Sequence, residues 1–181
     1  LIDGKPDDIE MILSKNNNLK KFIMCFNDKL ISLDSLKIDF SKNMQHLEVL
    51  ILRNNNIRYL PGDLFATTGN LKQLDLAHNK IKKLEMNMFD FLDQLEILYL
   101  SKNKLSNLPD GCFDYNLKLR ILDLSHNQLI NLNEFIFMFQ SQLESLNLNY
   151  NELKAIPCAS LQCCKKLKQL HFLGNDIEMT L

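Results

Sequence analysis

The chain has 181 residues, of which 46% are hydrophobic and 24% are charged, and its formal net charge at pH 7 is −1. This balance excludes an overall electrostatic field of the kind that attracts nucleic acid, so we expect no nucleic-acid partner. No apolar run approaches about 18 residues, so we expect no direct membrane insertion of this segment.

Residues 1–46 carry an irregular form of a pattern that becomes regular downstream. Its apolar and asparagine positions are Leu19, Phe22, Met24, Asn27 and, one position late, Leu30. The next copy begins 28 residues after Leu19, at Leu47, so this copy carries extra residues in its return segment. The stretch PDDIEMILSKNNN before it resembles the tail of a further copy. We interpret residues 1–46 as degenerate repeats.

From Leu47 onward the sequence repeats every 24 residues without a gap. The copies begin at Leu47, Leu71, Leu95, Leu119, Leu143 and Leu167. They share the pattern L-x-x-L-x-L-x-x-N-x-L-x-x-L, and in the first four copies a phenylalanine follows five residues later. This spacing is the signature of leucine-rich repeats.

The L-x-x-L-x-L segment predicts a short strand in each copy. In the second copy, Leu74 and Leu76 should point inward while Asp75 points outward, because side chains alternate along a strand. One repeat cannot bury its own leucines, so successive strands should stack in parallel. The resemblance implies an α/β fold, a right-handed leucine-rich repeat solenoid of horseshoe shape with a parallel concave sheet and an irregular or 3-10 convex side. We expect residues 1–181 to form a single leucine-rich repeat domain.

Two further sets of residues should line the interior. Asparagines at the end of each strand should pair with buried backbone groups. These are Asn55, Asn79, Asn103, Asn127, Asn151 and Asn175. Large apolar residues should form a spine on the opposite side. These are Phe65, Phe89, Phe113 and Phe137, followed by Leu161.

Prolines at 61, 109 and 157 give the motif L-x-x-L-P, which is followed after Pro61 and Pro109 by x-x-x-F. It resembles the 24-residue "typical" repeat of extracellular proteins: Toll and Toll-like receptor ectodomains, Slit, small proteoglycans and insect leucine-rich immune proteins. The resemblance implies an extracellular or cell-surface ectodomain, with a role in innate immunity. The chain departs from that subclass at Thr68, Asn116 and Gln140, where leucine is usual.

The cysteines leave the compartment open. There are five, an odd number, and none of the 21 asparagines stands in an N-x-S/T sequon. Cys164 occupies an inward leucine position, Cys25 an outward one, and Cys158 and Cys163 lie close enough in sequence to bridge. Cys158, Cys163, Cys164 and His171 match a zinc site poorly, so we expect neither a metal nor another cofactor. The missing sequon favours a cytoplasmic location instead.

Catalysis finds no support in the sequence. His78 and His126 stand near Asp75 and Asp123, but the segments LDLAHN and LDLSHN resemble the repeat consensus itself. A nucleophile with a base and an orienting group is not evident. We therefore expect a protein that is not an enzyme.

A binding site should occupy the outward positions of the concave sheet, because these side chains pack against nothing. Tyrosine and arginine are enriched among residues that dominate interface energies. The candidate partner-binding residues are Ile51, Arg53, Asp75, His78, Tyr99, Lys102, Asp123, His126, Asn147, Tyr150 and His171. We expect a non-catalytic protein-recognition module whose partner is a protein ligand or another leucine-rich repeat protein. The alternative is an intracellular signalling scaffold.

Overall fold

The computed structural model describes residues 16, 18–25, 29–30, 32 and 44–178. The predicted Asn27 and the segment before residue 16 lie outside the described residues. Seven strands form one sheet in sequence order, and all neighbouring pairs are parallel. They are β1 (Lys21–Ile23), β2 (Val49–Ile51), β3 (Gln73–Asp75), β4 (Ile97–Tyr99), β5 (Ile121–Asp123), β6 (Ser145–Asn147) and β7 (Gln169–His171).

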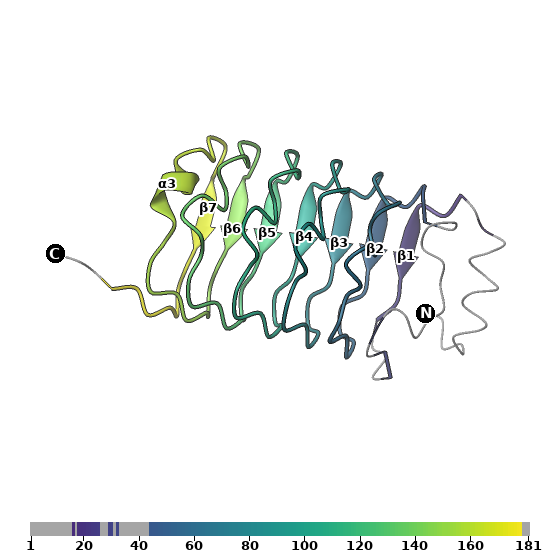
Figure 1. Ribbon diagram of the computed structural model, residues 1–181, viewed down its shortest axis with the longest axis horizontal. Coiled ribbons are helices and arrows are strands. Elements are labelled where there is room, and N and C mark those ends of the chain that lie inside the picture. The colour runs from purple at the N-terminus through teal and green to yellow at the C-terminus, as the bar shows by residue number, and fades with distance from the viewer. Residues whose placement is uncertain (1–15, 17, 26–28, 31, 33–43, 179–181) are drawn as a thin grey trace.

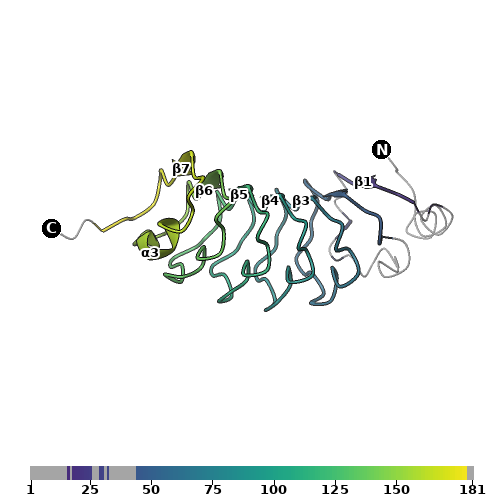
Figure 2. The ribbon, with the colours of Figure 1, turned by 90° about the horizontal axis from the view of Figure 1, so that it is seen from above.

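The strands recur as the repeat pattern predicts. Each strand from β3 to β7 begins 24 residues after the one before it. Lys21 of β1 pairs with Val49 of β2, which confirms that the irregular copy joins the sheet despite its longer return segment. Figures 1 and 2 show the strands along one side of a continuous coil and the return segments on the other. The predicted leucine-rich repeat solenoid with a parallel sheet is confirmed.

The inward leucines form the core, as the spacing predicts. Leu50, Leu74 and Leu98 are in register across β2, β3 and β4, and each is fully buried. Each copy therefore covers the leucines of the copy before it, which no isolated repeat of this size can do.

The asparagines bind the backbone between copies. The Nδ2 group of Asn79 donates to the carbonyls of Leu76, at 3.0 Å, and of Leu52 in the preceding copy, at 2.9 Å. Its Oδ1 accepts the N–H of Ile57 at 3.0 Å. Asn103 repeats these bonds one copy later. The asparagine ladder thus satisfies backbone groups that would otherwise be buried without partners.

The phenylalanine spine is also confirmed. Phe65, Phe89, Phe113 and Phe137 are fully buried. Successive ring centroids lie 6.1 to 6.2 Å apart. The spine therefore follows the sheet from copy to copy.

The convex side is irregular, as expected. Within the described residues it consists of separate turns closed by bonds from residue i to residue i−3, such as Leu64 N–H to Pro61 O at 3.1 Å. One return segment instead contains the short helix α3 (Cys158–Leu161). These turns have 3-10 bonding but do not continue into a regular helix, because the chain must reverse toward the next strand within a few residues.

Two of the residues that replace the usual leucine, Asn116 and Gln140, form a second ladder of hydrogen bonds beneath the convex side. Asn116 and Gln140 are fully buried. The Nδ2 group of Asn116 donates to the carbonyls of Phe89 and Leu92, each at 2.9 Å. The Nε2 group of Gln140 donates to the Phe113 carbonyl at 2.7 Å. These amides replace apolar packing with hydrogen bonds to the preceding copy.

Candidate functional site

The concave sheet brings the predicted site residues into adjacent columns, because residues at equal repeat positions lie side by side. The exposed members are Arg53, Lys102, His126, Tyr150 and His171. The half-buried members are Ile51, His78, Tyr99, Asp123 and Asn147. All ten offer surface to a partner. The remaining member, Asp75, does not.

Asp75 requires a correction to the expected site. Only 4% of its surface is exposed. Its Oδ1 accepts the N–H of Ala77 at 3.0 Å, and its Oδ2 lies 3.8 Å from Nη1 of Arg53. Burial raises the pKa of the carboxyl, while the hydrogen bond from Ala77 and the charge of Arg53 oppose that rise. Outward strand geometry alone did not reveal that the neighbouring segment covers this side chain.

The same short-range bond recurs in this column. Asp123 Oδ1 accepts the N–H of Ser125 at 3.0 Å, and Asn147 Oδ1 accepts the N–H of Asn149 at 3.1 Å. An Asp or Asn side chain that binds the backbone two residues later stabilises the turn that leaves the strand. These three residues therefore have a local structural role.

Tyr99 occupies the same column but lacks the Asp or Asn side chain that forms this bond. It pairs in register with Asp75 of β3 and Asp123 of β5, and its ring is half-buried between them. A phenol cannot form the short Asp-type turn, so this position carries a large amphipathic side chain at the middle of the sheet. Tyrosine at a partly covered central position is the kind of residue that dominates binding energies.

A second column lies three residues past the strand ends, and its backbone is left-handed in each copy. The φ angles are 56° at His78, 53° at Lys102 and His126, and 54° at Tyr150. Such φ values are uncommon for residues with side chains. Each copy adopts this strained conformation where the chain bends away from the strand. The shared conformation makes these side chains project in parallel.

His78 is held neutral within this column. Burial lowers the pKa of its imidazole, and the nearby charges of Lys102 and Arg53 lower it further. A neutral imidazole carries one donor and one acceptor nitrogen. At pH 7 His78 therefore offers a partner both kinds of hydrogen bond rather than a positive charge.

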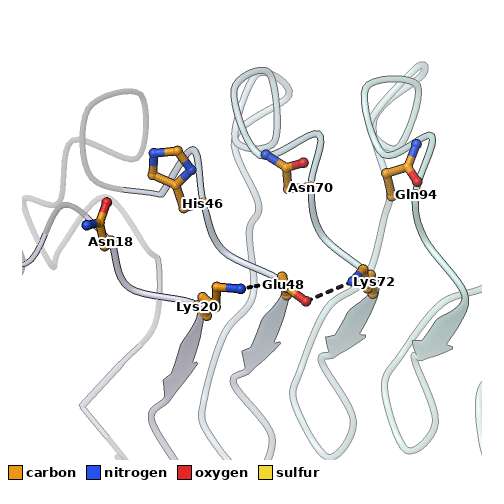
Figure 3. Close-up of a pocket in the computed structure, with 7 residues that line it drawn as sticks. All are labelled: Asn18, Lys20, His46, Glu48, Asn70, Lys72 and Gln94. Carbon is orange, nitrogen blue, oxygen red and sulfur yellow. Dashed lines mark hydrogen bonds and ion pairs between the residues drawn. The ribbon is translucent and has the colours of Figure 1, made fainter.

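The edge that precedes the strands carries an alternating row of charges (Figure 3). Glu48 lies 2.9 Å from Nζ of Lys20 and 2.8 Å from Nζ of Lys72. Glu144 is held in the same way by Arg120 and Lys168, each at 2.8 Å. We call this row of seven charged residues the charge ladder. Its members are Lys20, Glu48, Lys72, Glu96, Arg120, Glu144 and Lys168. Since its acids and bases lie on successive copies, it favours one register of stacking.

The charge ladder also borders a shallow hollow of about 420 Å³. Its lining is Asn18, Lys20, His46, Glu48, Asn70, Lys72 and Gln94. Hydrogen bonds from Lys72 and Lys20 hold the pKa of Glu48 at about 2, so this carboxylate is ionised and already paired. The hollow therefore offers a ligand little uncompensated charge.

Exposed aromatic residues on the convex side were missed by the sequence reasoning. Phe91, Tyr115 and Phe139 occupy the same repeat position and are 58%, 62% and 49% exposed. Reading that position across the copies would have revealed them, because an aromatic repeated every 24 residues stands out from the polar neighbours. They provide apolar surface outside the concave face.

The remaining expectations concern cysteines, metals and membranes. All five cysteines are free thiols, so Cys158 and Cys163 do not form the bridge that their spacing allowed. Among the described residues, no group of three or more His, Cys, Asp or Glu side chains is placed to hold a metal ion. No helix in the described part of the chain is both long and apolar enough to span a bilayer.

Comparisons with known proteins agree with this architecture. A family profile described as "Leucine rich repeat" matches residues 17–81, 45–105, 93–138 and 117–177. A search of curated proteins finds no significant match.

Several solved structures are similar. One is a leucine-rich repeat protein of Leptospira interrogans, with 34% identity, a TM-score of 0.67, and coverage of 74% of this chain and 33% of that one. The APL1 leucine-rich repeat domain has 26% identity and a TM-score of 0.68, with coverage of 80% and 37%. An internalin of Listeria monocytogenes shares the fold at 23% identity and a TM-score of 0.71, with coverage of 90% and 44%. The chain spans less than half the length of each of these proteins.

Proposed function

Because the chain belongs to the leucine-rich repeat family, whose members generally act as protein-interaction modules, we propose that it is a non-catalytic module that binds a protein on its concave face. The observation that carries the proposal is the position of Tyr99. It lies on the middle strand of the sheet, in register with Asp75 of β3 on one side and Asp123 of β5 on the other.

The residues around Tyr99 are suited to hold a partner. Arg53 and Tyr150 are exposed near opposite ends of the face, and both residue types are enriched where interfaces are strongest. Lys102 and His126 lie between them on an ordered left-handed backbone, so little conformational freedom is lost on binding. This arrangement supports a pre-organised surface for a protein or for another leucine-rich repeat chain.

The location proposed for the module is extracellular or at the cell surface, and its role innate-immune recognition. The support is the 24-residue repeat with proline after the fifth leucine position, which resembles the extracellular subclass. The five unpaired thiols favour the alternative, an intracellular scaffold, because secreted chains usually pair their cysteines.

The test uses the chain as bait and compares two tyrosine variants. Tyr99→Ala removes the central concave ring, while Tyr115→Ala removes a ring that is 62% exposed on the convex side. A protein captured by the wild type should bind Tyr99→Ala at least about tenfold more weakly, the effect of losing a dominant interface residue. Binding to Tyr115→Ala should be unchanged.

Quantitative mass spectrometry identifies the captured protein, and calorimetry with that purified protein gives both affinities. Arg53→Ala serves as a second concave variant. If Tyr99→Ala and Arg53→Ala bind normally while Tyr115→Ala does not, the partner uses the convex side and the proposal is wrong.

A further inference from the structure

Positive charge gathers on the edge that follows the strands. A hollow of about 270 Å³ is lined by Arg58, Tyr59, Lys80, Lys82 and Lys104. We call its four cations the basic edge. They come from the three consecutive copies that begin at Leu47, Leu71 and Leu95. The net charge of −1 does not reveal this cluster.

The basic edge is uncompensated. Within the described part of the chain, none of its four cations forms an ion pair. On the opposite edge, Lys72 and Lys168 each lie 2.8 Å from a glutamate. The fold therefore neutralises its cations along one edge and leaves them available along the other.

An ordered backbone fixes the spacing of these cations. The N–H of Lys80 donates to the Ile57 carbonyl at 2.8 Å, and the N–H of Lys104 donates to the Ile81 carbonyl at 2.8 Å. The asparagine ladder binds the same segment, because Oδ1 of Asn103 accepts the N–H of Ile81 at 3.0 Å. A ligand therefore meets lysines whose main chains are already in place, which lowers the entropic cost of binding.

The row of positive charge is interrupted in the fourth copy, where the position equivalent to Arg58 and Lys82 is Ile130. A lysine, Lys154, returns at that position in the fifth copy. The positions equivalent to Lys80 and Lys104 in the next two copies are Gln128 and Glu152. At roughly 4.8 Å per strand the basic edge is about 10 Å long. This length matches about three residues of an extended peptide and is too short to follow a long polyanion. The hollow also includes the Tyr59 ring, which is 66% exposed and offers apolar contact beside the charges.

We propose that the basic edge binds a short carboxylate-rich segment of the partner protein and so orients the acidic part of that partner over the copies beginning at Leu47, Leu71 and Leu95. The inference rests on the proposed function in one respect, since it takes the partner to be a protein. Lys102 is exposed and extends the positive charge from the edge toward the concave face, so one partner can contact both surfaces. Complementary charge of this kind sets the orientation and rate of docking.

The test measures binding of a fluorescent glutamate decamer by anisotropy at physiological ionic strength. The edge variant is Lys82→Glu/Lys104→Glu. The matched control is Lys165→Glu/Lys166→Glu, which changes the net charge equally at two exposed lysines far from the hollow. The edge variant should weaken binding at least about tenfold, whereas the control should change it less than about twofold.

The neutral variant Lys82→Gln/Lys104→Gln should fall between wild type and the edge variant, and all variants should keep the wild-type melting temperature. Equal losses in the edge and control variants, or no binding of the decamer to wild type, would overturn the inference. So would much tighter binding of a charge-matched thymidine oligonucleotide or heparin oligosaccharide at this edge, because that result would assign the edge to another class of partner.

The two proposals can fail separately. Tyr99→Ala should not change binding of the glutamate decamer, because Tyr99 lies outside the hollow. If the captured protein depends on Tyr99 but binds the edge variant normally, the basic edge is not used and concave recognition stands. If the captured protein and the decamer both need the edge while Tyr99 has no effect, the concave proposal fails and the edge remains a site.

Discussion

The phenol ring of Tyr150 stacks on the imidazole ring of His126, with centroids 4.5 Å apart and planes inclined by 21°. The phenol ring also lies close to Gly174, where an added Cβ would be 2.6 Å from Cδ1 of Tyr150. Glycine at 174 thus lets an exposed aromatic residue lie flat on the concave rim. The rigid placement of Tyr150 depends on both neighbours.

We expect Gly174→Ala to displace the Tyr150 ring. Its φ of 69° disfavours a side chain, and the new methyl would collide with the ring, at a combined local cost of about 1–3 kcal/mol. NMR shifts of His126 and Tyr150 should report loss of the stack. Gly62→Ala is the control, because its added Cβ would meet nothing closer than 3.8 Å. Unchanged ring shifts in Gly174→Ala would show that the stack does not need this glycine.

The phenylalanine spine should be sensitive to truncation. Phe113 is fully buried between Phe89 and Phe137, so Phe113→Ala should lower the free energy of unfolding by about 3–5 kcal/mol. Tyr115→Ala, two residues away and largely exposed, should change it by less than about 0.5 kcal/mol. Urea denaturation of both variants measures the difference, and similar midpoints would contradict the packing described.

The asparagine ladder should also be required for stability. Asn103→Ala removes bonds to the carbonyls of Leu76 and Leu100 and to the N–H of Ile81. Buried backbone groups left unpaired should cost about 1–3 kcal/mol. Thermal unfolding monitored by circular dichroism tests this, with exposed Asn107→Ala as the control. An Asn103→Ala variant that melts with wild type would mean that water satisfies these groups.

The thiols should react in the order of their exposure. Cys158 is exposed, whereas Cys112 is buried and its pKa is raised strongly by burial and by Asp114. Burial raises the pKa of Cys164 to about 11. Because the thiolate is the nucleophile, iodoacetamide at pH 8 should modify Cys158 first and leave Cys112 and Cys164 last.

Mass spectrometry of peptides at successive times gives these rates. Cys25, which is half-buried and whose pKa is raised, should fall between the two groups. In urea the differences in labelling rate between the cysteines should vanish, because the unfolded chain exposes all of them. Native Cys164 labelling as fast as Cys158 would contradict its core position.

The charge ladder should contribute to acid sensitivity. Hydrogen bonds from paired cations lower the pKa of Glu48 and of Glu144 from 4.5 to about 2. A carboxyl with a lowered folded pKa contributes stability that is present above the unfolded pKa and lost as pH falls through the folded one. The melting temperature should therefore fall between pH 4.5 and about 2.

Glu48→Gln/Glu144→Gln should flatten this part of the pH profile, and added salt should do the same to wild type because both glutamates remain partly accessible to solvent. The raised pKa of Asp75 has the opposite effect on the pH dependence of stability. Asp75 is present in wild type and in the double variant, so it does not affect the comparison. An unchanged slope in the double variant would show that these pairs do not contribute.

The sequence by itself determined the solenoid and its core. A 24-residue period with leucines at fixed offsets admits one register of stacking, so Leu50, Leu74, Phe113 and Asn103 could be assigned to the interior without coordinates. Their roles follow from repeat position, because each copy packs only against its neighbours.

The tertiary structure decided which outward positions remain available and how charge is distributed. Asp75 stands at an outward position but is only 4% exposed, with its carboxylate bound to the N–H of Ala77 and 3.8 Å from Arg53. Lys72 and Lys82 look alike in the sequence, yet one is paired with Glu48 and the other is left without a carboxylate among the described residues. Burial and ion pairing depend on contacts across copies and along edges, and a one-dimensional period carries no information on how side chains share that space.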